Sequence, residues 1–250
     1  AVCEFANSDS WVILSPIAQS IKRKIEAVCT PLNDWDINIY RGVLTGYNEA
    51  FIISTEKREE ILANCQSEDE RERTAELIRP ILRGRDIKRY GYNWAGLYLI
   101  ATFPSRHYDI EQYPAVKEYL LSFGIERLEQ TGKEHNVNGE KIKARKKTCN
   151  KWFETQDSIS YWEDFSKPKM LWKRVGSILR FCYNDNETLG LDSTCFATGE
   201  NIEFICCVLN SPMGQYLLKD ATKTGTGELR VTVQAIEPIH IPQLGLETNS

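Results

Sequence analysis

The side chains in this sequence that could do chemistry are mainly basic ones, grouped in short segments. Residues 79–89 hold five basic residues and one acid, and residues 133–151 hold seven basic residues and two acids. Lysine and arginine neutralise phosphates, arginine can bridge guanine through two hydrogen bonds, and asparagine can read adenine in the same way. A solvated charged face is the alternative for any one segment. Because basic residues recur in five separate stretches between aromatic, hydroxyl and amide side chains, the pattern favours DNA binding.

Other kinds of site find less support in the residues. There is no G-x-S-x-G sequence, and the cluster at residues 224–227 (TGTG) lacks the lysine and the spacing of a P-loop. A methyltransferase active on amino groups would need a glycine-rich cofactor loop and a Pro-Pro dipeptide, and no two prolines are adjacent. The eight cysteines and three histidines do not have zinc-site spacing, so we expect scattered core thiols and no metal ligands.

Two alternatives to DNA binding remain open. Asp157, Glu163, Asp164 and Lys167 lie close in sequence, which is compatible with a metal-dependent nuclease. The basic patches could instead bind an acidic protein partner, as in a protein-interaction module.

Composition limits the class of protein. The chain has 250 residues, 42% of them hydrophobic, and a net charge of -4, which argues against wholesale non-specific adhesion to nucleic acid. No apolar run approaches the roughly 18 residues of a membrane span, and no secretory signal is present, so we expect a cytoplasmic protein. The sequence opens at Ala1 rather than at methionine, and we therefore expect a fragment of a longer protein.

The pattern of helix and strand signals predicts an α+β fold: an irregular strand-rich lobe with packing helices and a C-terminal helical hairpin. We expect a packing helix over residues 16–28, with an apolar stripe of Ile17, Ile21, Ile25 and Val28, and a solvated scaffold helix over 68–79. We also expect a helix from 114 and a hairpin of two helices over 201–218. We expect strands over residues 36–40, 50–54, 96–103, 168–175, 177–183, 194–198 and 229–242, and a mobile basic loop over 133–151.

The order of several motifs is similar to that of a known family. They are RGVLTGYNEAF (41–51), IRPILRGRDIKRY (78–90), WFE (152–154), FSKPKM (165–170), DST (192–194), LNSP (209–212) and IHIP (239–242). This series resembles the TaqI-like C-terminal specificity domain of restriction-modification enzymes, from about Trp35 to Pro242.

The resemblance implies a target-recognition domain of α+β fold that reads double-stranded DNA for an adenine-N6 methyltransferase, either alone or fused to an endonuclease. It implies that residues 1–250 are a single specificity domain, with a possible lobe boundary near 132–151, and that the catalytic methyltransferase domain lies elsewhere in the polypeptide. S-adenosylmethionine would bind that catalytic domain, and this fragment would hold neither catalytic residues nor a cofactor.

The candidate DNA contacts combine the matched motifs with the basic segments. They are Arg41, Thr45, Asn48, Arg83, Arg85, Lys88, Lys143, Arg145, Lys146, Lys147, Lys169, Lys173, Lys223, Thr224 and Arg230. Asp86 is expected to pair with a neighbouring arginine. Trp152, Trp162 and Trp172 are expected in the core rather than as intercalating wedges.

Overall fold

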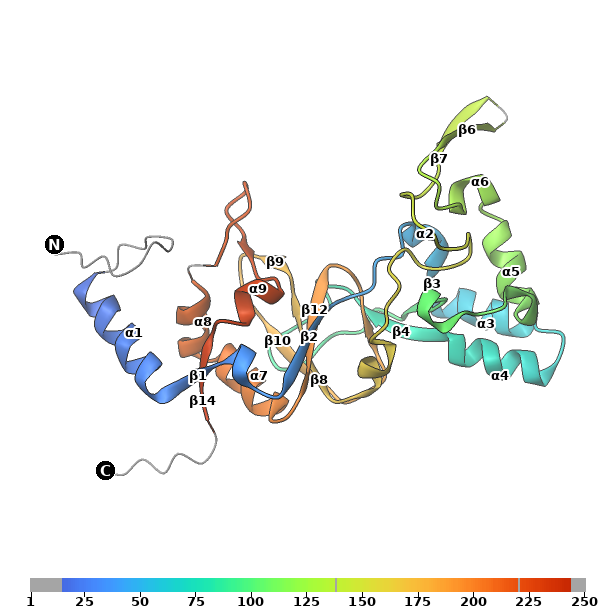
Figure 1. Cartoon of the computed structure of the whole chain (residues 1–250). Coiled ribbons are helices and arrows are strands. Elements are labelled where there is room, and N and C mark those ends of the chain that lie inside the picture. Colours follow the sequence, from blue (N-terminus) through green and yellow to red (C-terminus); the bar gives the residue numbers. More distant parts are fainter. Residues whose placement is uncertain (1–14, 138, 220, 244–250) are drawn as a thin grey trace.

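A four-stranded antiparallel sheet crosses the middle of the molecule (Figure 1). The computed structural model describes residues 15–137, 139–219 and 221–243. The sheet has the order β10-β8-β12-β2 and is built from β2 (Ile37–Arg41), β8 (Lys169–Lys173), β10 (Phe181–Asn184) and β12 (Thr194–Gly199). Most of these residues match the strands that the sequence predicts.

A second four-stranded sheet lies on one side of the first, with helices around it (Figure 1). Its order is β11-β4-β5-β3, and β11 runs parallel to β4. Its strands are β3 (Ile52–Ser54), β4 (Ile78–Leu82), β5 (Leu97–Ile100) and β11 (Leu189–Gly190). The helices of this side are α2 (Asn48–Phe51), α3 (Thr55–Ala63), α4 (Glu68–Leu77), α5 (Pro114–Leu121) and α6 (Ile125–Leu128).

The other side of the central sheet holds the predicted helical hairpin. It consists of α7 (Ile202–Asn210) and α8 (Pro212–Leu218). Asn210 is buried at the end of α7, where its amide Nδ2 donates to the carbonyl of Phe181 at 2.7 Å and its Oδ1 accepts the N–H of Phe181 at 3.1 Å. The two bonds hold the hairpin against β10.

Short elements complete the chain. The strands are β1 (Cys29–Pro31) paired with β14 (His240–Pro242), β9 (Val175–Gly176) paired with β13 (Leu229–Arg230), and β6 (Glu134–Val137) paired with β7 (Glu140–Lys143). The remaining helices are α1 (Pro16–Val28), α9 (Val233–Ile236) and the 3-10 turns Leu32–Asp34, Pro104–Arg106, Ile110–Gln112 and Trp162–Ser166.

The central sheet separates two hydrophobic cores. Side chains alternate across a strand, so that Leu171 and Phe196 pack into the core that also contains Phe51 and Leu99. The neighbouring residues Met170, Trp172 and Ala197 pack into the core beneath α7, α8 and α9. Both faces of the sheet are therefore covered, and the prediction of an α+β fold is confirmed.

Helix α1 begins as predicted but does not pack as predicted. The Ser15 hydroxyl accepts the N–H of Ala18 at 3.2 Å, and Pro16 occupies the first turn. However, no residue of α1 is buried, and Ile17 and Val28 are 74% and 60% exposed. The expected packing of its apolar stripe is therefore only partial: Ile25 is half-buried, whereas the rest of the stripe is exposed.

Helix α4 is more than the predicted solvated scaffold. Ser67 caps it by accepting the N–H of Glu70 at 3.2 Å. The Glu70 side chain is only 3% exposed, and its carboxylate accepts the N–H groups of Gln66 at 2.8 Å and of Ala115 at 3.0 Å. Glu70 thus joins α4 to the start of α5. The helix ends at Leu77, and Pro80 lies within β4.

Three further expectations need correction. Residues 133–151 contain the β6–β7 hairpin, where we expected a mobile loop. The tail at 229–242 is two short strands separated by α9 rather than one strand. Among the cysteines expected as core thiols, Cys182, Cys195 and Cys206 are buried, Cys149 and Cys207 are exposed, Cys29 and Cys65 are intermediate, and Cys3 lies outside the described residues.

Two of the three tryptophans expected in the core are only half-buried. Trp172 is fully buried, whereas Trp152 and Trp162 are intermediate. None of the helices described is long and apolar enough to cross a lipid bilayer.

Candidate nucleic-acid interface

The loop after β2 begins with a close approach of two backbones. Gly42 is buried, and a Cβ at this position would lie 2.1 Å from the carbonyl oxygen of Leu191. The N–H of Gly42 donates to Thr194 O at 3.1 Å, and the N–H of Val43 donates to Gly190 O at 2.7 Å. Only glycine fits here, and the contact fixes the exposed Arg41 beside the 191–194 turn.

The next part of this loop is a side-chain-stabilised turn. The Thr45 hydroxyl donates to Asn48 Oδ1 at 2.7 Å and accepts the N–H of Tyr47 at 3.1 Å. Thr45 is fully buried, whereas Asn48 is exposed at the start of α2. The assignment of Thr45 as a DNA contact is therefore corrected, because its hydroxyl is used within the fold.

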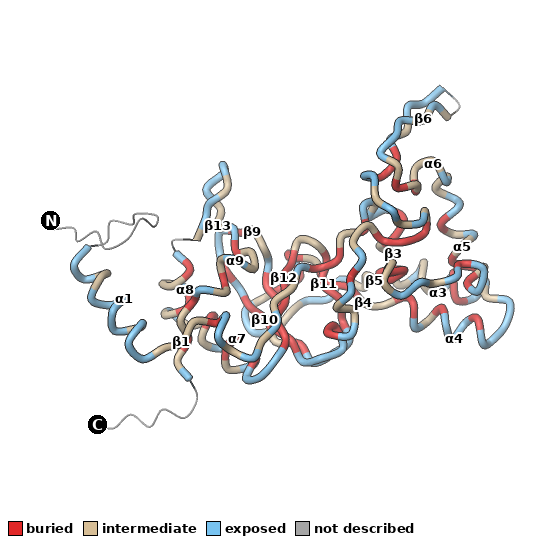
Figure 2. The backbone as a smooth tube through the Cα atoms, in the orientation of Figure 1, coloured by how far each residue is buried: buried red, intermediate tan, exposed pale blue. Residues whose placement is uncertain are grey.

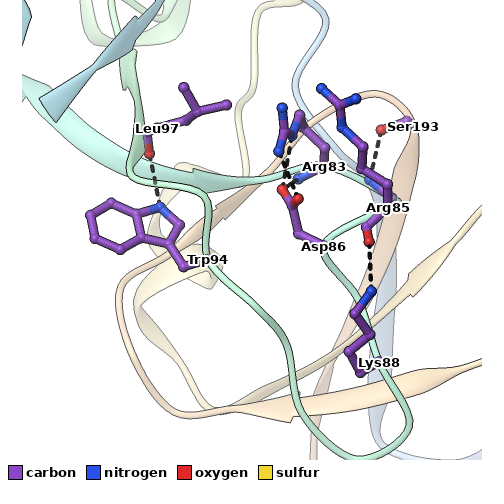
Figure 3. Close-up of polar contacts among 8 residues, drawn as sticks. Arg83, Arg85, Asp86, Lys88, Trp94, Leu97 and Ser193 are labelled. Atoms are coloured by element: carbon purple, nitrogen blue, oxygen red, sulfur yellow. Dashed lines mark hydrogen bonds and ion pairs between the residues drawn. The ribbon is translucent and has the colours of Figure 1, made fainter.

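Residues 83–88 form a turn that is held from inside by an ion pair (Figure 3). Two parallel bonds join Arg83 to Asp86: Nε to Oδ2 at 3.0 Å and Nη2 to Oδ1 at 2.8 Å. The backbone N–H of Arg83 also donates to Asp86 Oδ2 at 2.9 Å. Burial raises the pKa of the Asp86 carboxyl, but the bonds and charge of Arg83 outweigh burial and lower that pKa below 3.8. The expected pairing of Asp86 is present.

Replacing Asp86 with asparagine should lower the free energy of unfolding at neutral pH by about 2 kcal/mol, because the half-buried Arg83 loses its anionic partner. The folded pKa of Asp86 is lowered, so the carboxylate contributes stability above pH 3.8, and this contribution is lost as the pH falls through the folded pKa. Denaturant unfolding at pH 7 and at a series of acid pH values measures both effects. The assignment would be contradicted if lowering the pH from 7 to below 3.8 reduced the free energy of unfolding of Asp86→Asn by as much as that of wild type.

The 192–194 turn joins this loop to the central sheet. Ser193 accepts the N–H of Gly84 on its Oγ at 3.0 Å and the N–H of Arg174 on its carbonyl at 3.0 Å. Arg174 Nη1 donates to Asp192 O at 2.7 Å, and Arg174 O accepts the N–H of Val231 at 2.7 Å. The segments that carry Arg41, Arg85 and Lys173 therefore meet at this turn, and the segment that carries Arg230 is joined to it through Arg174.

We call these four exposed residues the basic ridge: Arg41, Arg85, Lys173 and Arg230. Gly84 allows the approach of the Lys173 stem, since a Cβ on Gly84 would lie 2.8 Å from Lys173 Cγ. Figure 3 shows Arg85 beside Ser193, while Lys88 donates to Arg85 O at 3.2 Å. The charged groups of these four residues make no hydrogen bond or ion pair with another residue that the structure describes, so they are exposed to an approaching anion.

The positioning residues of the ridge were not among the sequence candidates. Ser193 and Arg174 contribute hydrogen bonds that hold the ridge segments together. The signal for Ser193 is present in the motif DST at 192–194, which the resemblance singles out without giving it a role.

Acidic residues lie close to the ridge. Burial raises the pKa of Asp157, as does the charge of Asp192, while Arg41 and Lys146 lower it. Among residues 15–137, 139–219 and 221–243, no group of three or more His, Cys, Asp or Glu side chains could hold a metal ion. The nuclease alternative therefore has no candidate ligand set within these residues.

Two predicted DNA contacts are buried cations that bind carbonyl oxygens. Arg145 is 4% exposed, and its guanidinium donates to the carbonyls of Leu128, Thr45 and Glu154 at 2.8 Å and of Trp152 at 2.7 Å. Burial lowers the pKa of Arg145 to about 10, so it remains charged at neutral pH.

Lys169 is fully buried at the start of β8. Its ammonium donates to the carbonyls of Phe165 at 2.7 Å, Lys167 at 3.4 Å and Asn186, and burial lowers its pKa to about 8. We correct both assignments, because neither Arg145 nor Lys169 is accessible to DNA.

The remaining candidates lie outside the ridge. Lys143 lies on the β6–β7 hairpin, Lys146 and Lys147 follow it, and Lys223 and Thr224 lie in the loop before β13. In this loop Thr224 O accepts the N–H of Gly227 at 2.9 Å, and the Thr224 N–H donates to Glu228 O at 2.8 Å. Lys143, Lys146, Lys147 and Lys223 are exposed, and Arg83, Lys88 and Thr224 are half-buried.

The sequence model of the TaqI-like C-terminal specificity domain matches residues 79–241, which is more than half of the chain. The chain belongs to this family. The match covers the 83–88 turn, the β6–β7 hairpin and the 192–194 turn, so the TaqI-like specificity domain includes most of the surface described above. No curated protein matches the chain.

Two solved structures are similar to this TaqI-like domain. One is the type IIL restriction-modification enzyme MmeI in complex with DNA, with a TM-score of 0.52 and 11% identity over 84% of this chain and 25% of that chain. The other is the type IIG restriction endonuclease BpuSI, with a TM-score of 0.49 and 14% identity over 91% of this chain and 25% of that chain. The domain thus spans about a quarter of the length of either enzyme, and the MmeI likeness shows a common fold.

Proposed function

We propose that this TaqI-like domain binds double-stranded DNA at a specific sequence and so directs a catalytic domain of the same polypeptide to its target. The observation that carries the proposal is the basic ridge, four exposed cations on segments that are joined at the 192–194 turn, directly or through Arg174. The turn and three of the four residues lie within the family match. Exposed lysine and arginine side chains bind phosphates and, in a groove, bases. The DNA complex of MmeI supports a DNA ligand for this fold.

We further propose that the parent polypeptide methylates adenine at N6. On this view S-adenosylmethionine binds the catalytic domain, and this domain recognises DNA without catalysing a reaction itself. The glycine cluster of this domain, 224–227, forms an exposed turn in which the hydroxyls of Thr224 and Thr226 are hydrogen-bonded to each other at 2.8 Å. This turn does not follow a strand into a helix as a cofactor loop does.

The chain should retain a short sequence motif from a pool of randomised duplexes. Binding would be selected at about 50 mM and again at about 200 mM salt, since phosphate-driven binding weakens steeply over this range. Base contacts keep a preferred sequence bound when phosphate attraction is reduced. We therefore expect one motif to remain enriched at the higher salt, as measured by sequencing the bound fraction.

Other outcomes would favour the alternatives. Retention of all duplexes without enrichment would contradict sequence recognition. Magnesium-dependent cleavage that is lost in Asp157→Asn or Glu163→Gln would indicate a nuclease. Binding to an acidic protein, with no affinity for any duplex at low salt, would indicate an interaction module.

A further inference from the structure

The β6–β7 hairpin projects from the body of the molecule (Figure 1). Its two strands pair Glu134 with Lys143, His135 with Ile142, Asn136 with Lys141 and Val137 with Glu140. Opposite residues of an antiparallel pair share a face. One face therefore carries Glu134, Asn136, Lys141 and Lys143, all of which are exposed. We call these four residues the ribbon face.

The opposite face lies toward the protein near the base of the hairpin and is exposed at Glu140. His135, Val137 and Ile142 are half-buried on it, and His135 Nε2 lies 3.7 Å from the carboxylate of Glu129. The ribbon face, by contrast, makes no side-chain hydrogen bond or ion pair with any other residue that the structure describes. Its polar groups are thus available to a partner and are not needed to hold the hairpin.

The base of the hairpin is firmly anchored. The N–H of Ala144 donates to Lys133 O at 2.9 Å, and the N–H of Gly132 donates to Arg145 O at 2.8 Å. Arg145 is the buried cation whose guanidinium binds four carbonyls. The projecting strands are therefore attached to one of the best-connected points of the fold, and Figure 2 shows the change from buried base to exposed strands. An anchored ribbon loses little conformational freedom on binding.

A two-stranded ribbon of this kind fits the major groove of B-DNA, which is about 12 Å wide. In that groove asparagine can bond both N6 and N7 of adenine, and lysine can bond O6 and N7 of guanine. Asn136 and Lys141 are directly opposite each other, so both reach the same small set of base pairs. Lys143, two residues nearer the anchor, is placed for a flanking phosphate.

We propose that the ribbon face enters the major groove of the target duplex and that Asn136 and Lys141 determine part of its sequence specificity. This inference rests on the proposed function, since it assigns base reading to one element of a DNA-binding domain. The basic ridge then supplies phosphate contacts, and the ribbon supplies discrimination between bases.

The test uses the full chain and the motif that it selects from the duplex pool. Asn136→Ala should weaken binding to that motif by about 5- to 100-fold, the range of one bidentate base contact. It should also select a motif that is degenerate at one base pair, while its affinity for unrelated duplexes stays unchanged. Lys141→Ala should relax a neighbouring position. Lys24→Ala removes an exposed charge from α1 and serves as the matched control, with the motif and affinity unchanged.

A second measurement is specific for the major groove. Replacing each adenine of the motif in turn with 7-deazaadenine removes the N7 acceptor without changing base pairing. Wild type should lose affinity at one position, and Asn136→Ala should be insensitive there. Circular dichroism and thermal unfolding verify that each variant is folded.

The failures of the two proposals are distinguishable. If wild type selects a motif and the Asn136→Ala and Lys141→Ala variants select the same motif with equal affinity, the ribbon proposal is overturned and the proposed function stands. A uniform loss of affinity in Lys141→Ala, with a salt slope about 1 unit shallower, would make Lys141 a phosphate contact and overturn its reading role. If wild type binds no duplex selectively, both proposals are overturned.

Discussion

Replacing Arg145 with alanine is expected to lower the free energy of unfolding by about 3–5 kcal/mol. The substitution removes the donors that bind the carbonyls of Leu128, Thr45, Glu154 and Trp152. These carbonyls lie in segments far apart in sequence, and water cannot readily replace a donor that is 4% exposed. Each buried acceptor left without a partner costs about 1–3 kcal/mol. Part of this cost is offset because the variant no longer buries a charged group.

The neighbouring Lys146 provides a matched control, because it is exposed and carries the same charge. Lys146→Ala should change the free energy of unfolding by less than about 0.5 kcal/mol. Arg145→Lys should also be clearly destabilising, since an ammonium has three donors and lacks the planar fork that reaches four carbonyls. Urea unfolding monitored by tryptophan fluorescence measures all three variants. If the urea midpoints of Arg145→Ala and Lys146→Ala were equal, the buried guanidinium would not contribute to the stability of the fold.

Removing three cations of the basic ridge together should weaken binding to the selected duplex by about 100- to 1000-fold at about 0.1 M salt, if each contacts one phosphate. The variant Arg41→Ala/Lys173→Ala/Arg230→Ala should also give a plot of log affinity against log salt that is shallower by about 3 units. All three side chains are exposed, so the fold should be retained. Binding titrations at several salt concentrations give both quantities.

Helix α1 supplies the control for this experiment. Lys22→Ala/Arg23→Ala/Lys24→Ala makes the same change in net charge at exposed positions outside the ridge. This second variant should bind nearly as tightly as wild type. An equal loss in both would mean that net charge alone, and not the ridge, governs affinity.

The predictions from sequence succeed where local signals decide the structure. Ser15 and Pro16 begin α1, and Ser211 and Pro212 begin α8, because capping and a fixed proline φ act within one turn. Strand β12 is found because its β-branched and aromatic residues lie in a buried sheet. The prediction of a strand at β5 is likewise confirmed.

The failures arise where distant contacts decide the structure. The β6–β7 hairpin has a charged sequence with little β propensity, and its anchor is the backbone around Arg145. The charges of Arg145 and Lys169 suggest exposure, and only the converging carbonyls of separate segments explain their burial. A run of basic residues in the sequence does not distinguish an exposed cation that could contact a phosphate from a buried cation that binds carbonyl oxygens.

The candidate site shows the same division. The family motifs at 41–51 and 78–90 contain the segments that carry Arg41 and Arg85, and the structure shows that Gly42 and Gly84 in these motifs lie in close contact with other segments. That Ser193 accepts hydrogen bonds from Gly84 and Arg174 depends on the tertiary fold. No local pattern could have indicated that these segments meet at one turn.

The central sheet has a consequence for how the molecule can be divided. Successive residues of β8 and β12 belong to different cores: Leu171 and Phe196 to one, Met170, Trp172 and Ala197 to the other. Neither half could be excised as an autonomous unit, since either dissection would leave one apolar face of the sheet open to water. We therefore infer that the two cores melt in one cooperative transition. An exchange of specificity between relatives would then succeed by grafting projecting surface segments onto this sheet, and not by trading halves of the domain.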